Sequence, residues 1–233
     1  MHSLPARIYG VLRRPRATFS AIIEAPEWAS VLIATTVIVC SCSAGFLRTE
    51  VGHQALVDQW ERTALAFGQH IDDAQYAQME SLSAAGGVMY AALTALLAGP
   101  VLASVLAAVL FIVLNRTTGY RASYVKVLTV VCHAGVVLAL RQAIAAPVDY
   151  MRESLASPAT LVQFVNMLDE TSPVARFLGV IDLFVVWWIV VLAIGLSVLY
   201  GRSARWLALV FTGAYVALAL LAAIAMAVSG GTA

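Results

Sequence analysis

Charged residues are rare in this sequence. Asp, Glu, Lys and Arg make up 12% of its 233 residues, whereas apolar residues make up 61%. Soluble domains usually contain about 25% charged and about 45–50% apolar residues, and the mean hydropathy of +0.87 agrees with this difference. The composition therefore excludes an ordinary soluble domain and indicates an integral membrane protein.

Cysteines are few, and the motifs of common enzymes are missing. Cys40, Cys42 and Cys132 lie in apolar stretches, whereas a disulfide framework belongs in exported loops, so we expect no disulfide. The sequence lacks H-E-x-x-H, G-x-S-x-G, a P-loop and the glycine motif that binds dinucleotides. His53 and His70 lack metal-ligand spacing, and the scattered basic residues form no nucleic-acid-binding stripe. We predict neither an enzyme nor a protein that holds a metal or another cofactor.

Long apolar stretches dominate the chain. Residues 177–200 contain one charge, Asp182. As a helix this stretch would be about 36 Å long, whereas the hydrocarbon core of a bilayer is about 30 Å thick. Four comparable stretches lie at about 28–47, 88–114, 125–147 and 206–228. The sequence thus predicts an all-α bundle of five transmembrane helices that forms a single domain over residues 1–233.

Shorter amphipathic helices are expected outside these stretches. In the polar segment 50–87, Leu56, Trp60 and Phe67 recur at helical spacing, which predicts one amphipathic helix. In the segment 148–176, Ser157-Pro158 is a typical helix start. Residues 1–27 interleave arginines with apolar residues and prolines, which predicts short interfacial helices with arginines toward anionic headgroups. These basic residues are Arg7, Arg13, Arg14 and Arg16.

Basic and acidic residues fall on different loops. The amino-terminal segment, the second loop and the fourth loop hold nine of the 14 Lys and Arg residues. The first and third loops hold ten of the 13 acids. The positive-inside rule then places the amino terminus in the cytoplasm and the carboxyl terminus outside. We expect a multi-pass protein of a cytoplasmic membrane.

Three polar side chains lie inside predicted spans. Arg141 and Asp182 lie at about the same depth near the outer ends of antiparallel spans, which favours an ion pair between them. A role in transport or proton relay, and snorkelling of Arg141 to the headgroups, are the alternatives. His133 is deeper, and it is either hydrogen-bonded between helices or a titrating group in a pore.

Small residues recur at every fourth position of the second predicted span. Such a ridge lets helix backbones approach closely in lipid, within the chain or in a second copy. General alanine richness is the alternative explanation. Gly99-Pro100 should kink this helix. The ridge consists of Ala91, Ala95, Gly99, Ala103 and Ala107.

Several motifs together resemble a known family. They are L-R-R-P at 12–15 followed by Phe19 and A-P-E-W at 25–28, G-Y-R-A-S-Y at 119–124, and D-L-F-V-V-W at 182–187. The chain resembles the Yip-one domain (Yip/Yif) family of membrane proteins, in its prokaryotic branch. The resemblance implies five spans with a cytoplasmic amino end, in the cytoplasmic (inner) membrane of a prokaryote. Eukaryotic members bind Rab-type GTPases, but their long amino-terminal region is missing here, so GTPase binding is not carried over.

Two functions follow as hypotheses. The first is a non-catalytic membrane organiser, either a scaffold or an accessory subunit of a membrane complex. Its expected partners are the lipid bilayer and other membrane proteins or a second copy, and no nucleic acid. The alternative is a small-solute or ion transporter or channel that uses His133, Arg141 and Asp182.

Solvent access next to His133 distinguishes the two hypotheses. With Cys40 and Cys42 replaced, we expect a membrane-impermeant thiol reagent to leave Cys132 unlabelled in both intact and inverted vesicles. Labelling from either side would mean that water reaches the middle of the membrane, and would favour a transporter. Ser203→Cys in a background without native cysteines serves as the control. It should be labelled in inverted vesicles alone, and labelling in intact vesicles would contradict the predicted orientation.

Overall fold

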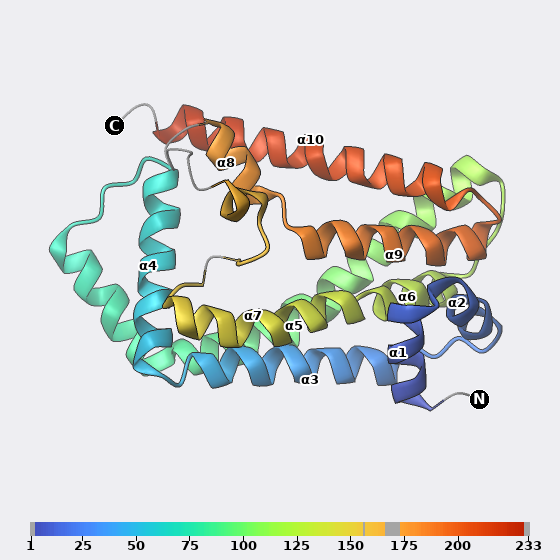
Figure 1. Ribbon diagram of the computed structural model, residues 1–233, viewed down its shortest axis with the longest axis horizontal. Coiled ribbons are helices and arrows are strands. Elements are labelled where there is room, and N and C mark those ends of the chain that lie inside the picture. Colours follow the sequence, from blue (N-terminus) through green and yellow to red (C-terminus); the bar gives the residue numbers. More distant parts are fainter. Residues whose placement is uncertain (1–2, 156, 166–172, 231–233) are drawn as a thin grey trace. The chain divides into compact units, whose positions relative to one another are not determined.

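The computed structural model describes residues 3–155, 157–165 and 173–230. The described chain is helical, and five of its helical segments are long and apolar enough to cross a membrane, as expected (Figure 1). Its helices are α1 Leu4–Arg13, α2 Pro15–Glu24, α3 Ala29–Phe46, α4 Glu50–Ala66, α5 Asp73–Thr118, α6 Tyr124–Ala134, α7 Val136–Arg152, the 3-10 helix η1 Leu161–Phe164, α8 Pro173–Val180, α9 Leu183–Tyr200 and α10 Ala204–Gly230.

The second span begins earlier than its apolar stretch suggests. Helix α5 starts at Asp73 and continues through Pro100 to Thr118. Its start is capped reciprocally, because the Gln75 N–H donates to Asp72 Oδ1 at 2.7 Å and the Asp72 N–H donates to Gln75 Oε1 at 3.1 Å. Such a box satisfies two backbone donors that have no helical partner. Part of the predicted outer loop is therefore a helical extension of the span.

The third and fourth spans are interrupted. Gly135 separates α6 from α7, and the Leu138 N–H donates to the Gly135 carbonyl at 3.0 Å, which tightens the backbone there. Residues Ile181 and Asp182 separate α8 from α9. The continuous helix expected over residues 177–200 is therefore wrong, and its membrane-length part is Leu183–Tyr200.

The chain forms two compact units. Unit 1 contains Met1–Val39, Thr94–Arg141 and Phe184–Gly213, and unit 2 contains Cys40–Leu93, Gln142–Leu183 and Ala214–Ala233. Unit 1 carries ten Lys or Arg residues and two acids, whereas unit 2 carries four and eleven. The charge segregation seen along the sequence is thus also a segregation between compact parts of the fold.

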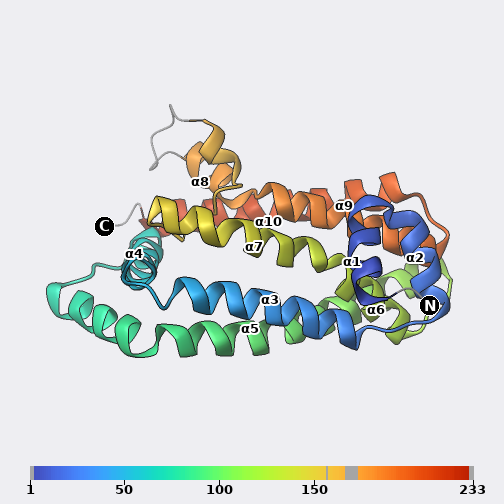
Figure 2. The ribbon, with the colours of Figure 1, turned by 60° about the horizontal axis from the view of Figure 1, so that its bottom comes forward.

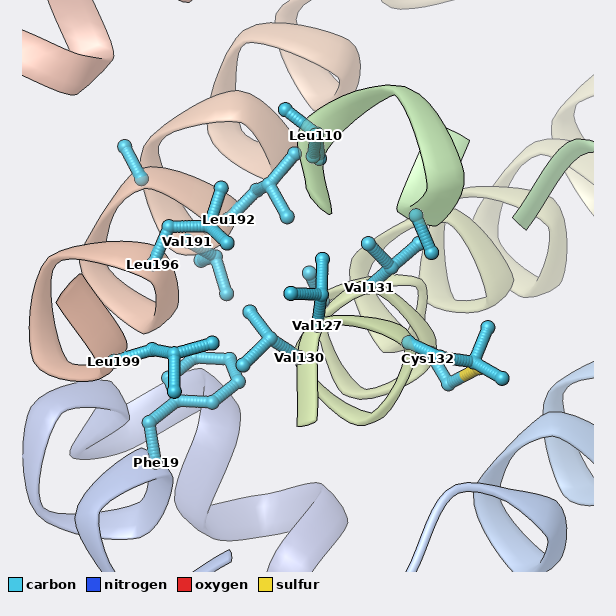
Figure 3. Packing of buried hydrophobic residues seen from close by; sticks show 14 of the residues in the cluster. Phe19, Leu110, Val127, Val130, Val131, Cys132, Val191, Leu192, Leu196 and Leu199 are labelled. Atoms are coloured by element: carbon cyan, nitrogen blue, oxygen red, sulfur yellow. The ribbon is translucent and has the colours of Figure 1, made fainter. Parts of the chain in front are cut away.

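The core of unit 1 forms where α2, α6 and α9 meet. Phe19 from α2, Val130 from α6 and Leu196 from α9 are all fully buried in one apolar cluster (Figure 3). Gly195 permits this approach, because a Cβ there would lie 2.6 Å from Val130 Cγ1 and 3.0 Å from Phe19 Cε1. The amino-terminal helices thus form part of the core, in addition to the interfacial position predicted for them.

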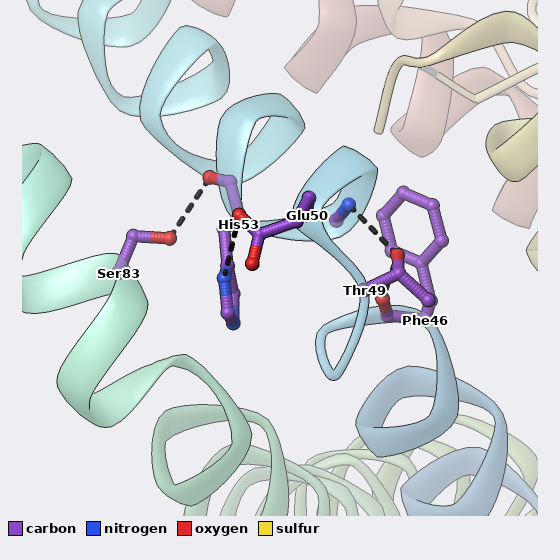
Figure 4. Close-up of polar contacts among 6 residues, drawn as sticks. Phe46, Thr49, Glu50, His53 and Ser83 are labelled. Atoms are coloured by element: carbon purple, nitrogen blue, oxygen red, sulfur yellow. Dashed lines mark hydrogen bonds and ion pairs between the residues drawn. The ribbon is translucent and has the colours of Figure 1, made fainter.

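In unit 2, α4 forms the amphipathic helix predicted for the first loop. Thr49 caps it: its hydroxyl donates to the Phe46 carbonyl at 2.8 Å and accepts from the Gly52 N–H at 3.0 Å (Figure 4). Ser83 of α5 donates to the His53 carbonyl at 2.8 Å and so ties α5 to α4.

The third loop differs from its prediction. No α-helix begins at Pro158 in the described part of this loop. Residues 158–159 form a turn, and the 3-10 helix Leu161–Phe164 follows. A helix that starts at Pro158 would present Leu161, Val165 and Leu168 on its apolar side, and Leu168 lies outside the described residues.

Substitution of Gly195 tests the packing of α9 on α2 and α6. We expect Gly195→Ala to destabilise the purified protein in detergent by about 1–3 kcal/mol, because the added methyl group overpacks the site. Thermal unfolding measures this. Gly213→Ala is the matched control, since nothing lies within 4 Å of its Cβ position. Equal melting temperatures for the two variants would contradict the observed packing.

Candidate functional site

Asp182 occupies the break in the fourth span. It is 4% exposed, between the end of α8 at Val180 and the start of α9 at Leu183. The Ser157 hydroxyl donates to Asp182 Oδ2 at 2.6 Å. A polar loop of the chain therefore folds onto this acid.

The backbone groups around the break have partners inside unit 2. The Tyr215 hydroxyl of α10 donates to the Val180 carbonyl at 2.7 Å and accepts from the Asp182 N–H at 3.0 Å. The remaining bonds form an isolated antiparallel bridge between residues 159–161 and 181–183. In it, the Leu161 N–H donates to the Ile181 carbonyl at 2.9 Å, and the Leu183 N–H donates to the Ala159 carbonyl at 3.0 Å. Non-helical backbone at membrane depth is tolerated only where protein or enclosed water satisfies it.

The pair predicted between Arg141 and Asp182 stays a prediction. Arg141 is the last residue of a segment of unit 1, whereas Asp182 belongs to unit 2. Asp182 is positioned by contacts within its own unit, with Ser157 and Tyr215. The sequence pattern indicates Asp182 as an unusual acid, but it indicates neither Ser157 nor Tyr215 as its partner. The spacing of Ser157 and Tyr215 from Asp182 gave no signal for their contact.

His133 lies at the end of α6, in the core of unit 1. The side chain is fully buried, and Nδ1 lies 2.8 Å from the Thr129 carbonyl. Because a carbonyl only accepts, Nδ1 carries the proton and Nε2 is left as an acceptor. Nε2 is buried and has no hydrogen-bond partner within the described chain. The intrahelical bond to Thr129 differs from the interhelical bond proposed for this histidine.

Arg7 stands apart from the other amino-terminal arginines. Arg7 Nη1 lies 2.7 Å from Glu27 Oε2, and Nη2 donates to the Ser30 hydroxyl at 3.4 Å. The Arg7 side chain is 13% exposed, whereas Arg13, Arg14 and Arg16 are exposed. Hydrogen bonds from Ser30 and Arg7 hold the pKa of the Glu27 carboxyl below its usual value. This pair joins α1 to the start of α3.

The small-residue ridge of α5 is only partly used within the chain. Ala91, Ala95 and Ala107 are buried, and Ala103 is half-buried. Gly99 is exposed, and nothing lies within 4 Å of its Cβ position. The ridge therefore packs inside the protein near its ends and is open at its centre.

Unit 2 also contains an open cavity of about 510 Å³. Its lining combines aromatic and methionine side chains with neutral polar groups, and the rings of Trp60 and Tyr90 meet edge to face at 5.9 Å. No group of three or more His, Cys, Asp or Glu residues in the described ranges could hold a metal ion. The lining residues are Gln59, Trp60, Thr63, Ala64, Phe67, Gln69, Met79 and Tyr90.

Comparison with protein families gives one match over most of the chain. The family model described as Yip1 domain matches residues 9–226. The matched range runs from within α1 to within α10, and it includes every motif on which the sequence resemblance depends. Comparisons with curated proteins and with solved structures give no match.

Removal of the Tyr215 hydroxyl tests the break at Asp182. We expect Tyr215→Phe to lower the free energy of unfolding in detergent by about 1–3 kcal/mol, because the Asp182 N–H and the Val180 carbonyl lose a shared buried partner. Thermal unfolding with the full chain measures the loss. The control is Tyr150→Phe, which removes the hydroxyl of a half-exposed tyrosine. Equal stability of the two variants would rule out this role for Tyr215.

Proposed function

We propose, from the premise that the chain belongs to the Yip1 domain family, that it is a non-catalytic membrane organiser. In this role it acts as a scaffold or as an accessory subunit of a membrane complex. The protein is a multi-pass integral membrane protein, and members of the family are generally non-catalytic proteins of membrane trafficking. We further propose that the chain belongs to the prokaryotic branch of the family, that it lies in the inner membrane and that its amino terminus is cytoplasmic.

The large exposed apolar surface of α5 carries the proposal. In the most apolar 18-residue stretch of α5, only 11% is buried inside the protein. In the corresponding stretch of the span formed by α6 and α7, 61% is buried. Leu97, Val101 and Leu102 are more than half exposed beside the open position Gly99. In a bilayer, apolar side chains gain little by leaving the lipid, so close approach at small residues contributes to helix association. This face supports a lateral contact with another membrane protein or a second copy.

The buried polar residues support the same proposal. Asp182 accepts from Ser157 at a break whose backbone is bonded within unit 2, and His133 is fully buried at the end of α6. These contacts serve the fold itself. An organiser that acts through its outer surface needs no further chemistry from them.

A transporter is the second candidate, because the fourth span is broken at a buried acid. Discontinuous membrane helices commonly form the solute sites of transporters. The interruption of the third span at Gly135, two residues after His133, adds to this resemblance. Against it, the backbone carbonyls and N–H groups that would bind an ion at such a break already bond to Tyr215, Leu161 and Ala159. Solvent access at Cys132 separates this candidate from the organiser.

Site-specific photo-crosslinking in native membranes tests the organiser. With a photoreactive residue at Val101, we expect a protein adduct of discrete mass, because this position is on the exposed face of α5. The same residue at Ala107, which is 0% exposed, should give no such adduct.

A second substitution tests whether the open centre of the ridge makes the contact. Gly99→Leu should abolish the Val101 adduct, because the larger side chain prevents close helix approach, and it should leave thermal unfolding unchanged. Gly213→Leu, at another open glycine on α10, should leave the adduct intact. Adducts with lipid alone from Val101 would contradict the proposal.

A further inference from the structure

Seven exposed arginines belong to unit 1 and come from three separate parts of the chain. These parts are α1 with α2, the end of α5 with the connection to α6, and the connection from α9 with the start of α10. All three lie at the same end of this unit (Figure 1, Figure 2). The arginines are Arg13, Arg14, Arg16, Arg116, Arg121, Arg202 and Arg205.

Hydrogen bonds hold the two connections together. Asn115 stabilises the connection between α5 and α6. Its side chain donates to the Ala122 carbonyl at 3.1 Å and accepts from the Ala122 N–H at 3.2 Å. The Tyr200 hydroxyl, at the end of α9, also donates to Asn115 at 3.0 Å. Arg202 in the second connection donates to the Thr118 carbonyl at 3.2 Å. The arginines on both connections therefore extend from a defined scaffold.

The helices α1 and α2 are fixed to the same end. Val11 and Phe19 are fully buried, and Phe19 packs against the Gly195 position of α9 and near Val130 of α6. Arg13 remains exposed, and its Nη1 donates to the Tyr9 hydroxyl at 2.9 Å. The tertiary structure thus joins three arginine-bearing segments into one surface.

The residues around these arginines are typical of a membrane interface. Tyr120 is 50% exposed and Trp206 is 56% exposed, each next to an arginine in sequence. Trp and Tyr are enriched at the headgroup level of bilayers. The two acids of unit 1 are Glu24 and Glu27, and Glu27 already pairs with Arg7. The surface therefore keeps a strong excess of positive charge.

We propose that this surface binds the phosphate groups of anionic phospholipids. The whole chain has one lysine, Lys126, among its 14 basic residues, and the exposed basic residues of this end are arginines. The planar guanidinium group of arginine binds phosphate through two parallel hydrogen bonds, whereas lysine acts as a point charge. Juxtamembrane basic clusters are attracted to the anionic lipids of the cytoplasmic leaflet. Lipid binding at this surface does not depend on the lateral protein contact proposed for α5.

Lipid competition in detergent tests the surface independently of orientation in a membrane. The purified full chain is equilibrated in mixed micelles with equal amounts of phosphatidylglycerol and phosphatidylcholine, and the lipids that remain bound are quantified by mass spectrometry. We expect the wild type to enrich phosphatidylglycerol. The triple variant Arg16→Gln, Arg121→Gln and Arg205→Gln, with one change in each segment, should lose this enrichment by roughly tenfold or more.

A charge-matched control keeps the test specific. Arg48→Gln, Arg62→Gln and Arg152→Gln remove three exposed arginines from unit 2 and should leave the enrichment unchanged. Thermal unfolding verifies that both triple variants remain folded. If the wild type bound the two lipids equally, the inference would be overturned, and the surface would be free for an acidic protein partner. Equal losses in the two triple variants would overturn it as well, since they would reflect net charge alone.

Discussion

Every backbone polar group inside the hydrocarbon core of a membrane must find a partner without help from bulk water. This constraint is sharpest at Ile181 and Asp182, where a long apolar stretch leaves the helical conformation. The Tyr215 hydroxyl donates to one carbonyl and accepts from one N–H there. The loop that follows Ser157 forms further backbone hydrogen bonds with the break. Within unit 2, these bonds connect the break to Tyr215 of α10 and to residues 159–161 of the loop. The buried acid Asp182 lies at this break and accepts a hydrogen bond from the Ser157 hydroxyl.

A second consequence of the apolar surroundings is that charges lie at the ends of helices or pair locally. Arg7 and Glu27 form a pair that joins α1 to the start of α3. Seven of the other arginines of unit 1 remain exposed, and four of these lie on or beside the two connections that Asn115 and Thr118 hold. The cost of placing charges in apolar surroundings thus accounts for both the ion pair between Arg7 and Glu27 and the exposed basic surface.

Much of the architecture could be predicted from hydrophobicity. The number of spans and the amphipathic helix α4 agree with the apolar patterns, although the second span begins earlier and the fourth is shorter than predicted. The early start of α5 was not predicted because its first turns are polar. Their helical propensity and the reciprocal hydrogen bonds between Asp72 and Gln75 nevertheless favour a helix there. The pair between Arg7 and Glu27 was missed because no pattern of spacing predicts a contact across two proline-separated segments. For the candidate sites, the sequence identified which polar residues are unusual, but not their partners.

The sequence by itself determined that this chain is a five-span helical membrane protein with segregated charge, because the cost of exposing polar groups to lipid depends on composition and length. Only the tertiary structure decided where the spans break, which arginines are buried and which exposed ones share a surface. Those features depend on contacts between residues such as Asp182 and Tyr215, or Phe19 and Gly195, which are far apart in the chain. Hydrogen bonds and close packing act over a few ångströms in space, and a linear pattern contains no record of that proximity.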